Sequence, residues 1–265
     1  LVVVFCCLTV LAGGGLTAFF AAIFAASAAS LGLAAYLSAT RFTRPGPWAG
    51  WGRVRLLLRD ANALALSAFL NQGAGEIAIF PLKFLRGPLD VSFFLAGKRI
   101  VDAAMVVTRA LIIAMSPGIS RLGDDPAATP ALRRQLIASS RLAVMLMSPA
   151  ALSVSLLAGD VATLLLGADF APVGQSLPVL AWILPAFFIN ALMETALTAL
   201  RQPRALVLTH AVGFAWATLC GILAVKGWGF VGAAWAMLTA ALLVCGLNVG
   251  LVARLIGLPG LLRSL

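Results

Sequence analysis

The chain has 265 residues, of which 62% are apolar and 11% charged, and its mean hydropathy is +1.05. A soluble domain of this length does not need so many apolar residues, so most of the surface must contact lipid. The formal net charge is +10, but the basic residues lie in short loops between apolar runs and form no patch with aromatic residues. This distribution is typical of a membrane protein and argues against nucleic-acid binding.

The four cysteines, Cys6, Cys7, Cys220 and Cys245, all lie inside apolar runs. None has C-x-x-C spacing or a neighbouring histidine, so we expect no metal site and no cofactor. The sequence begins with Leu1, and its first apolar run is too short to span a membrane before the glycines at 13–15. We therefore expect a fragment that lacks the N-terminal part of a longer chain.

Hydropathy and breaker residues predict about eight membrane helices, an all-α polytopic bundle. The first four expected segments are Leu1–Ala12 (truncated), Leu16–Thr40, Leu56–Phe80 and Asp90–Leu122. The last four are Leu142–Ala158, Leu177–Leu200, Ala205–Val225 and Phe230–Ala253. Before the fifth, Ala131–Arg141 is expected to lie along the membrane surface as an amphipathic lead-in. The loop at 159–176 is expected to be partly helical.

The basic residues predict an orientation for this bundle. If the loops alternate between the two sides, thirteen basic residues lie on one side and five on the other, with Arg109 inside the bilayer. The five are Lys83, Arg86, Lys98, Arg99 and Lys226. The thirteen are Arg41, Arg44, Arg53, Arg55, Arg59, Arg121, Arg133, Arg134, Arg141, Arg201, Arg204, Arg254 and Arg263. The positive-inside rule then predicts that the richer side, with the C-terminus, is cytoplasmic.

The segment Asp90–Leu122 is the most informative, because it combines spanning length with four charged residues in its interior. Lys98, Asp102 and Arg109 recur at helical spacing on one face, and Arg99 lies three residues before Asp102. Charges in a membrane-length helix normally face a bundle interior or a watery cavity. Either they neutralise one another within the bundle, or they line a route for a charged solute. Arg109 has no acid one turn away on its own helix, which favours the second interpretation for this residue.

Several stretches, taken together and in order, resemble one transporter family. They are DVSFFLAGKRIVD at 90–102, AMSPGISRL at 114–122, LLLGADFAPVGQSLPVLAW at 164–182, LTALRQPR at 197–204 and KGWGFVGAAWAMLTAALL at 226–243. The pattern is similar to that of oligosaccharide and polysaccharide flippases of the multidrug/oligosaccharidyl-lipid/polysaccharide exporter superfamily. Two positions depart from it: Phe93-Phe94 replaces the usual tyrosine, and Glu76 stands where an aspartate is common.

The resemblance implies part of a two-lobed, twelve-helix transporter of the cytoplasmic membrane. Residues 1–45 would be the last two helices of the N-terminal lobe and residues 46–265 the six-helix C-terminal lobe. The implied substrate is a polyprenyl-diphosphate-linked oligosaccharide, flipped by alternating access for cell-surface polysaccharide synthesis. Besides this anionic lipid and the membrane lipids, polysaccharide polymerases and glycosyltransferases are the implied partners.

The diphosphate needs cations along its route, because its charges would lose their hydration in hydrocarbon. Arg109, Arg99 and Lys98 are the candidates, with Asp102 setting their position. Glu76 and Glu194 are candidates for sugar hydrogen bonds or for cation coupling. The alternative for both acids is a structural pairing with asparagine or with a basic residue of a neighbouring helix. The single histidine, His210, is expected to be a packed polar residue.

Other functions remain open at this stage. A cation-coupled multidrug or toxin exporter would share the fold, and so would a flippase for a lipid-linked peptidoglycan precursor. From another class, a membrane scaffold without transport activity is the alternative. We expect no enzymatic activity, because the loop acids Asp124, Asp125, Asp160 and Asp169 show neither D-x-D nor His–acid spacing.

Overall fold

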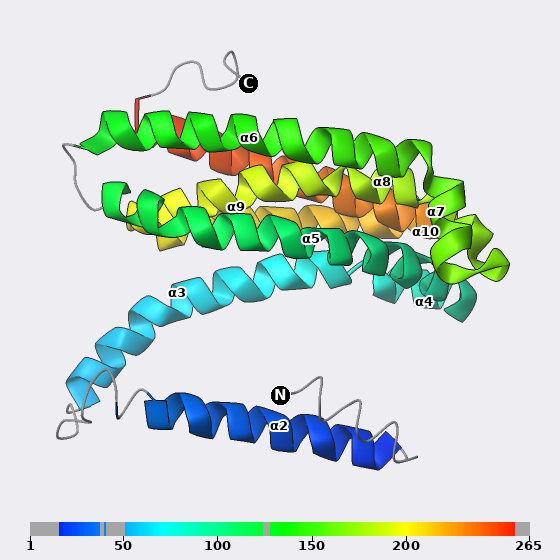
Figure 1. Cartoon of the computed structure of the whole chain (residues 1–265), viewed down its shortest axis with the longest axis horizontal. Helices are drawn as coiled ribbons and strands as arrows, with labels where there is room; N and C mark the ends of the chain where they lie inside the picture. The colour runs from blue at the N-terminus through cyan, green and yellow to red at the C-terminus, as the bar shows by residue number, and fades with distance from the viewer. Residues whose placement is uncertain (1–15, 38–39, 41–50, 124–127, 258–265) are drawn as a thin grey trace. The chain divides into compact units, whose positions relative to one another are not determined.

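The computed structural model describes residues 16–37, 40, 51–123 and 128–257. Within these residues every regular element is a helix, so the predicted all-α class is confirmed (Figure 1). Six of the described helical stretches are long and apolar enough to cross a membrane, which agrees with a polytopic bundle. The chain divides into two compact units, residues 1–58 and 59–265.

In the first unit, α2 (Leu16–Leu37) corresponds to the predicted Leu16–Thr40 span. The predicted segment Leu1–Ala12, with Cys6 and Cys7, lies outside the described residues. So does the expected lobe boundary between residues 45 and 46, which therefore stays a prediction.

The predicted segment Leu56–Phe80 is in fact two helices, α3 (Trp51–Glu76) and α4 (Ile79–Leu85). Pro81 explains the break, because it has no N–H to donate to the carbonyl of Ile77 four residues earlier. Gly87 then reverses the chain at φ 97°, and Pro88 follows it as the first residue of α5 (Pro88–Gly123). A glycine after one helix and a proline at the start of the next are favourable for such a turn.

The predicted central helix is confirmed, since α5 covers Asp90–Leu122 and continues through Pro117. Its buried stripe includes Phe94, Gly97, Val101 and Met105. Gly97 allows close packing, because a Cβ there would lie 3.2 Å from side-chain atoms of Leu180 and Val173. This stripe fixes the rotation of α5 and thereby decides which charged residues face the bundle interior.

The structure corrects the predicted surface lead-in. Ala131–Arg141 and Leu142–Ala158 are not separate elements, because a single helix, α6, runs from Thr129 to Leu156. Leu132 and Leu136 are fully buried in the core, so this part of the helix packs as the rest of α6 does. Arg133 and Arg134 are exposed, and their charge gave the sequence its amphipathic appearance.

The predicted partly helical loop is confirmed as α7 (Ala158–Leu166) and the 3₁₀ helix η3 (Ala168–Gln175). The predicted Leu177–Leu200 span is interrupted at Trp182, which separates α8 (Leu177–Ala181) from α9 (Ile183–Ala199). Pro185 accounts for the interruption, since it offers no N–H to the carbonyl of Ala181. The stretch Leu177–Ala199 lies at the centre of the bundle: 61% of its most apolar part is buried, against 11% for Ala61–Leu85.

The last element, α10 (Pro203–Leu255), is a helical hairpin and not one straight rod. Gly229 has the non-helical angles φ 57° and ψ −134° and divides it into two arms, 203–228 and 230–255. The two arms pack antiparallel. A hydrogen bond from Trp216 Nε1 on the first arm to Thr239 Oγ1 on the second, at 3.3 Å, links them. Gly232 lies directly against the carbonyl of Ala224. The predicted seventh and eighth spans are thus confirmed, with the turn where the sequence placed it.

Arg86 and Asp90 fasten the turn of this hairpin to the start of α5. The Arg86 guanidinium donates to the carbonyls of Val225 (3.2 Å), Lys226 (2.9 Å) and Gly227 (3.3 Å). These carbonyls belong to the last turn of the first arm, where helical partners are lacking and a positive charge is favourable. Asp90 lies beside Gly229, so the turn is held by residues from a distant part of the sequence.

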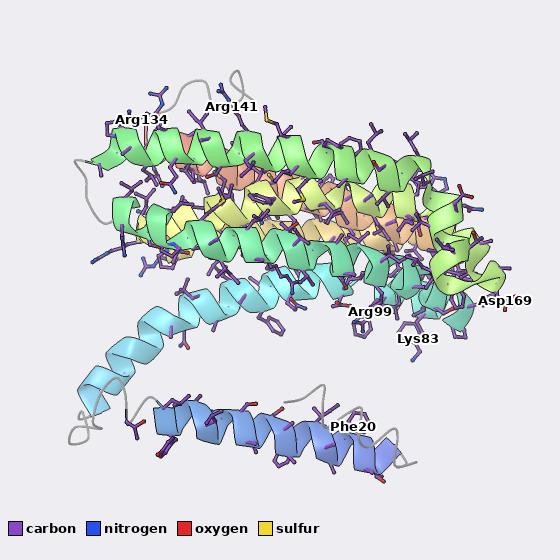
Figure 2. All side chains as sticks on the ribbon, in the orientation of Figure 1. Phe20, Lys83, Arg99, Arg134, Arg141 and Asp169 are labelled. Atoms are coloured by element: carbon purple, nitrogen blue, oxygen red, sulfur yellow. The ribbon has the colours of Figure 1, made fainter. Side chains whose placement is uncertain are left out.

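Basic residues gather at one end of unit 59–265, where α5 ends, α6 begins, α9 ends and α10 begins and ends (Figures 1 and 2). The residues at this end are Arg121, Arg133, Arg134, Arg201, Arg204 and Arg254. The opposite end has Lys83, Arg86 and Lys226 beside Asp90, Asp160 and Asp169, three charges of each sign. Several basic residues that the sequence assigned to loops lie inside helices, among them Arg55 in α3, Lys98 and Arg99 in α5, and Arg141 in α6.

Candidate functional site

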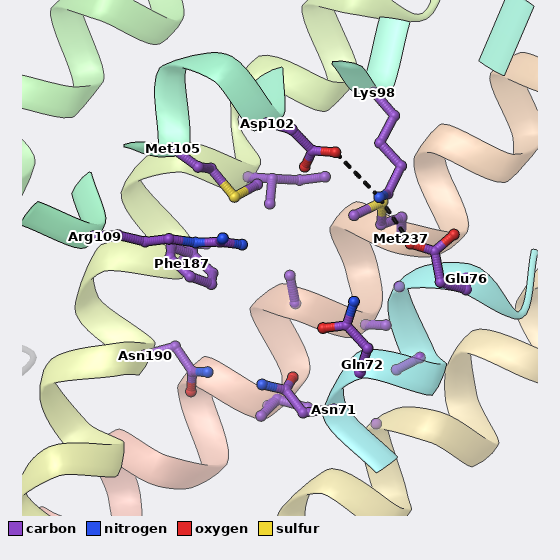
Figure 3. A pocket seen from close by; sticks show the side chains of 18 residues that line it. Asn71, Gln72, Glu76, Lys98, Asp102, Met105, Arg109, Phe187, Asn190 and Met237 are labelled. Carbon is purple, nitrogen blue, oxygen red and sulfur yellow. Dashed lines mark hydrogen bonds and ion pairs between the residues drawn. The ribbon is translucent and has the colours of Figure 1, made fainter. Parts of the chain in front are cut away.

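A pocket of about 150 Å³ lies inside unit 59–265, between α3, α5, α9 and the hairpin α10 (Figure 3). Four charged side chains line it, Glu76, Lys98, Asp102 and Arg109. Its amide side chains are Asn71, Gln72 and Asn190, and its apolar walls include Met105, Phe187 and Met237. The pocket is open to the outside of the bundle, since Arg109 is exposed and the side chains of Glu76 and Asp102 are 41% and 33% exposed.

Lys98 stands between two carboxylates at one side of the pocket. Its Nζ lies 2.9 Å from Glu76 Oε1 on α3 and 3.3 Å from Asp102 Oδ2 one turn along α5. The Lys98 side chain is 15% exposed, whereas those of Glu76 and Asp102 are 41% and 33% exposed. The group carries a net charge of −1, so Lys98 offers little attraction to an anion.

Arg109 occupies a different part of the pocket, two turns beyond Asp102 along α5. Its guanidinium carbon lies 5.9 Å from the centre of the Phe187 ring, a cation–π contact that orients the group (Figure 3). Within the described part of the chain, no carboxylate lies within ion-pair distance of Arg109. No hydrogen bond ties the Arg109 guanidinium to another described residue, so its N–H groups are available as donors to a ligand.

The pocket as a whole is formally neutral, because two basic and two acidic side chains line it. The excess of positive charge along α5 in the sequence therefore does not carry over to the pocket. The charges are separated within it: the surplus carboxylate lies near Lys98 and the unpaired cation at Arg109. Such a site can hold an anion at one end and donate or accept hydrogen bonds at the other.

Two of the predicted site residues do not line the pocket. Arg99 is exposed and points about 100° around α5 from Lys98 (Figure 2). Asp102 is bonded to Lys98 and not to Arg99. Glu194 lies behind Asn190, whose Nδ2 donates to Glu194 Oε1 at 2.6 Å. The alternative of a structural pairing therefore holds for both acids: Glu194 pairs with an asparagine, and Glu76 pairs with the basic residue Lys98 of a neighbouring helix.

A buried polar chain continues from Asn190 and was not predicted. His210 on the first arm of α10 lies 2.8 Å by Nε2 from Glu194 Oε1, and 2.7 Å by Nδ1 from Ser67 Oγ on α3. Asn248 on the second arm donates to Asn190 Oδ1 at 2.8 Å. His210 is packed as expected, at 3% exposure, and its Nε2 also lies within hydrogen-bond distance of the Glu194 carboxylate. The available sequence signal was that His210 and Glu194 each lie in an apolar run. Burying an ionisable side chain in such a run costs free energy unless it finds a polar partner.

The described residues contain no cluster of three or more histidine, cysteine or acidic side chains arranged to hold a metal ion. Comparisons with protein-family models, with curated proteins and with solved structures return no match for this chain. The chemistry of the pocket is therefore the basis for a functional proposal, and the family resemblance stays an expectation.

Proposed function

We propose that the chain is part of a membrane transporter that moves an anionic, lipid-linked oligosaccharide across the cytoplasmic membrane. The observation that carries the proposal is Arg109, an exposed cation that lines the pocket and has no acidic partner among the described residues. An unpaired charge in the middle of a membrane-length helix is costly in lipid and marks a path for a charged solute. A diphosphate supplies the missing negative charge, and two of its oxygens match the guanidinium fork.

The rest of the pocket fits the sugar part of such a substrate. Asn71, Gln72 and Asn190 provide amides that both donate and accept hydrogen bonds, as sugar hydroxyls and acetamido groups require. Glu76 and Asp102 are strong acceptors for hydroxyls. The polyprenyl tail would remain in lipid, so the pocket receives only the polar head.

The distribution of basic residues supports an orientation. The end of the bundle with Arg121, Arg133, Arg134, Arg201, Arg204 and Arg254 would be cytoplasmic by the positive-inside rule. The C-terminus would then be cytoplasmic too. Reporter fusions after Leu255 and within η3 test this, because the two fusions should report opposite sides. The same side for both would contradict the orientation.

The decisive experiment replaces Arg109 with Ala and with Lys and measures glycan export at equal protein level. Losing a charge-assisted contact of about 1.5–3 kcal/mol predicts a fall of about 10- to 100-fold for Arg109→Ala. Arg109→Lys should retain part of the activity, since it keeps the charge but not the fork. Arg99→Ala is the matched control, being exposed on the same helix outside the pocket. Unchanged export by Arg109→Ala would remove this residue from the substrate path.

A second function, export of a cationic drug in exchange for a cation, is favoured by one observation. The group formed by Glu76, Lys98 and Asp102 carries a surplus carboxylate, which could bind a cation once Lys98 is displaced. Asp102→Asn distinguishes the two functions. It should abolish export of a cationic drug, whereas glycan export should fall less than in Arg109→Ala.

A further inference from the structure

A second, larger hollow lies on the hairpin α10, away from the pocket described above. It is a groove of about 930 Å³ between the two arms, and nine of the ten described residues that line it belong to them. The tenth is Gln175 of η3. This helix lies beside the turn of the hairpin, because the Phe93 ring contacts both Phe170 of η3 and Phe230 of the second arm. The groove therefore runs from the turn along the arms as far as Thr239.

The walls of the groove are apolar. No charged side chain is among the described residues that line it, and two exposed indoles, Trp228 and Trp235, form part of its sides. Thr239 already donates to the Trp235 carbonyl at 2.9 Å and accepts from an indole of the first arm at 3.3 Å. Small residues leave the space: a Cβ at Gly227 would meet no atom within 4 Å. Beyond Gln175, a polar ligand would lose hydration without gaining hydrogen bonds, whereas a hydrocarbon chain would not.

The groove opens on an exposed apolar surface of α10. This element has a mean hydropathy of 2.1 in its most apolar part, and on or beside the groove Leu219, Leu223 and Leu242 are 63%, 72% and 53% exposed. In a bilayer the neighbours of such a surface are hydrocarbon chains, and an unfilled hollow would forfeit their packing contacts. At the turn, Trp228 and the exposed Lys226 are residue types that lie at the level of lipid headgroups.

The groove and the first pocket lie on opposite sides of the second arm. Trp235 and Thr239 line the groove, whereas Met237 and Ala241 line the pocket. At about 100° per residue, the centres of these two pairs are about 160° apart around the helix axis. A lipid with its head in the pocket would have to reach across α10 to place its tail in the groove. The groove is thus not the continuation of the pocket, and its occupant is a different molecule.

We propose that this groove binds an acyl chain of a membrane phospholipid, with the headgroup beside the turn of α10 and the chain directed towards Thr239. The groove encloses the chain between two arms, so it buries more of the chain than a flat helix surface does and binds it more tightly. The chain fills the space that Gly227 leaves and contacts both arms of the hairpin.

The test is quenching of Trp235 fluorescence by a phosphatidylcholine that carries bromine in the middle of one chain. Trp235 is kept, and the other tryptophans of the full chain are replaced by phenylalanine. The brominated lipid is then titrated into the protein in detergent, and the quenching should saturate at low ratios of lipid to protein. Gly227→Leu, which fills the groove, should weaken the apparent affinity about tenfold, since it displaces about two methylene groups of the chain.

Two controls use the second arm. Gly246 is exposed, and a Cβ there would also meet no atom within 4 Å, but it does not line the groove. Gly246→Leu should therefore leave the apparent affinity unchanged. Leu242 is an exposed position outside the groove. With the tryptophan moved there, by Trp235→Phe and Leu242→Trp, quenching should rise with added lipid and not saturate at low ratios.

The competing occupants give different results. Quenching of Trp235 that does not saturate would overturn the proposal, and so would equal weakening by Gly227→Leu and Gly246→Leu. Displacement of the brominated lipid by a polyprenol at lower concentration than by unbrominated phosphatidylcholine would assign the groove to a prenyl chain instead. No quenching in a protein that elutes as a dimer would assign it to a second copy. Transport is not measured, so each result is independent of the function proposed above.

Discussion

Replacing Gly229 with alanine tests how the hairpin α10 is held. Gly229 has φ 57° and ψ −134°, a region that residues with a Cβ rarely adopt. The backbone strain alone is worth about 1–3 kcal/mol. In addition, a Cβ would lie 2.7 Å from Asp90 Oδ2, so the carboxylate beside the turn would have to move. We therefore expect Gly229→Ala to lower the free energy of unfolding by about 2–4 kcal/mol.

Thermal unfolding in detergent measures this effect, and the same turn offers a matched control. A Cβ at Gly227 would meet no atom within 4 Å and its backbone is helical, so Gly227→Ala should be nearly neutral. For a chain of this size, each kcal/mol corresponds to about 2–4 °C in Tm. Gly229→Ala should thus unfold at least about 4 °C below Gly227→Ala. Equal Tm values for the two variants would refute the reasoning from backbone angle and contact.

Three further predictions use the same unfolding assay. Arg201 has φ 56° at the end of α9, where its N–H donates to the carbonyl of Thr198 and the N–H of Gln202 donates to the carbonyl of Leu197. Because glycine adopts this angle without strain, Arg201→Gly should be about 1 kcal/mol more stable than Arg201→Ala. Equal stabilities would argue against strain there. Arg86→Met loses three carbonyl contacts and should cost about 2 kcal/mol, whereas exposed Lys83→Met should cost under about 0.5 kcal/mol. Lys98→Met leaves the partly exposed acids Glu76 and Asp102 unpaired and should lower the free energy of unfolding by about 1–3 kcal/mol. A loss no larger than that of Arg99→Met would contradict the ion-pair assignment.

The sequence predicted the parts of the fold that depend on local pattern. Spanning length identified α5 despite its charges, and the glycines around Trp228 identified the hairpin turn. The lead-in before α6 was predicted wrongly, because exposed Arg133 and Arg134 give a helix an amphipathic pattern whether its other face meets lipid or protein. Leu132 and Leu136 meet protein here, and only tertiary packing decides that.

The site was predicted only in part, because a sequence does not state which helices are neighbours. Lys98 and Arg99 are adjacent and differ by about 100° around the helix axis, so the rotation of α5 decides which one enters the pocket. The small residue Gly97 within the buried stripe was the available signal for that rotation. Ser67 and His210 are 143 positions apart, and no local pattern connects them.

The ion pair between Lys98 and Glu76 bears on how the chain is inserted into the bilayer during synthesis. A charged residue at the centre of a membrane helix raises the free energy of insertion by about 2.5–3.5 kcal/mol. With four charged residues in its interior, α5 alone would therefore insert poorly. Glu76 is synthesised before Lys98 and can neutralise it if α3 is still next to the translocation channel when α5 enters. We therefore expect α3 and α5 to be released into lipid together, and a glycosylation-site insertion assay of α5 with and without α3 measures the difference. The Lys98–Glu76 contact would then lower the free energy of inserting α5 before it lines the pocket of the folded protein.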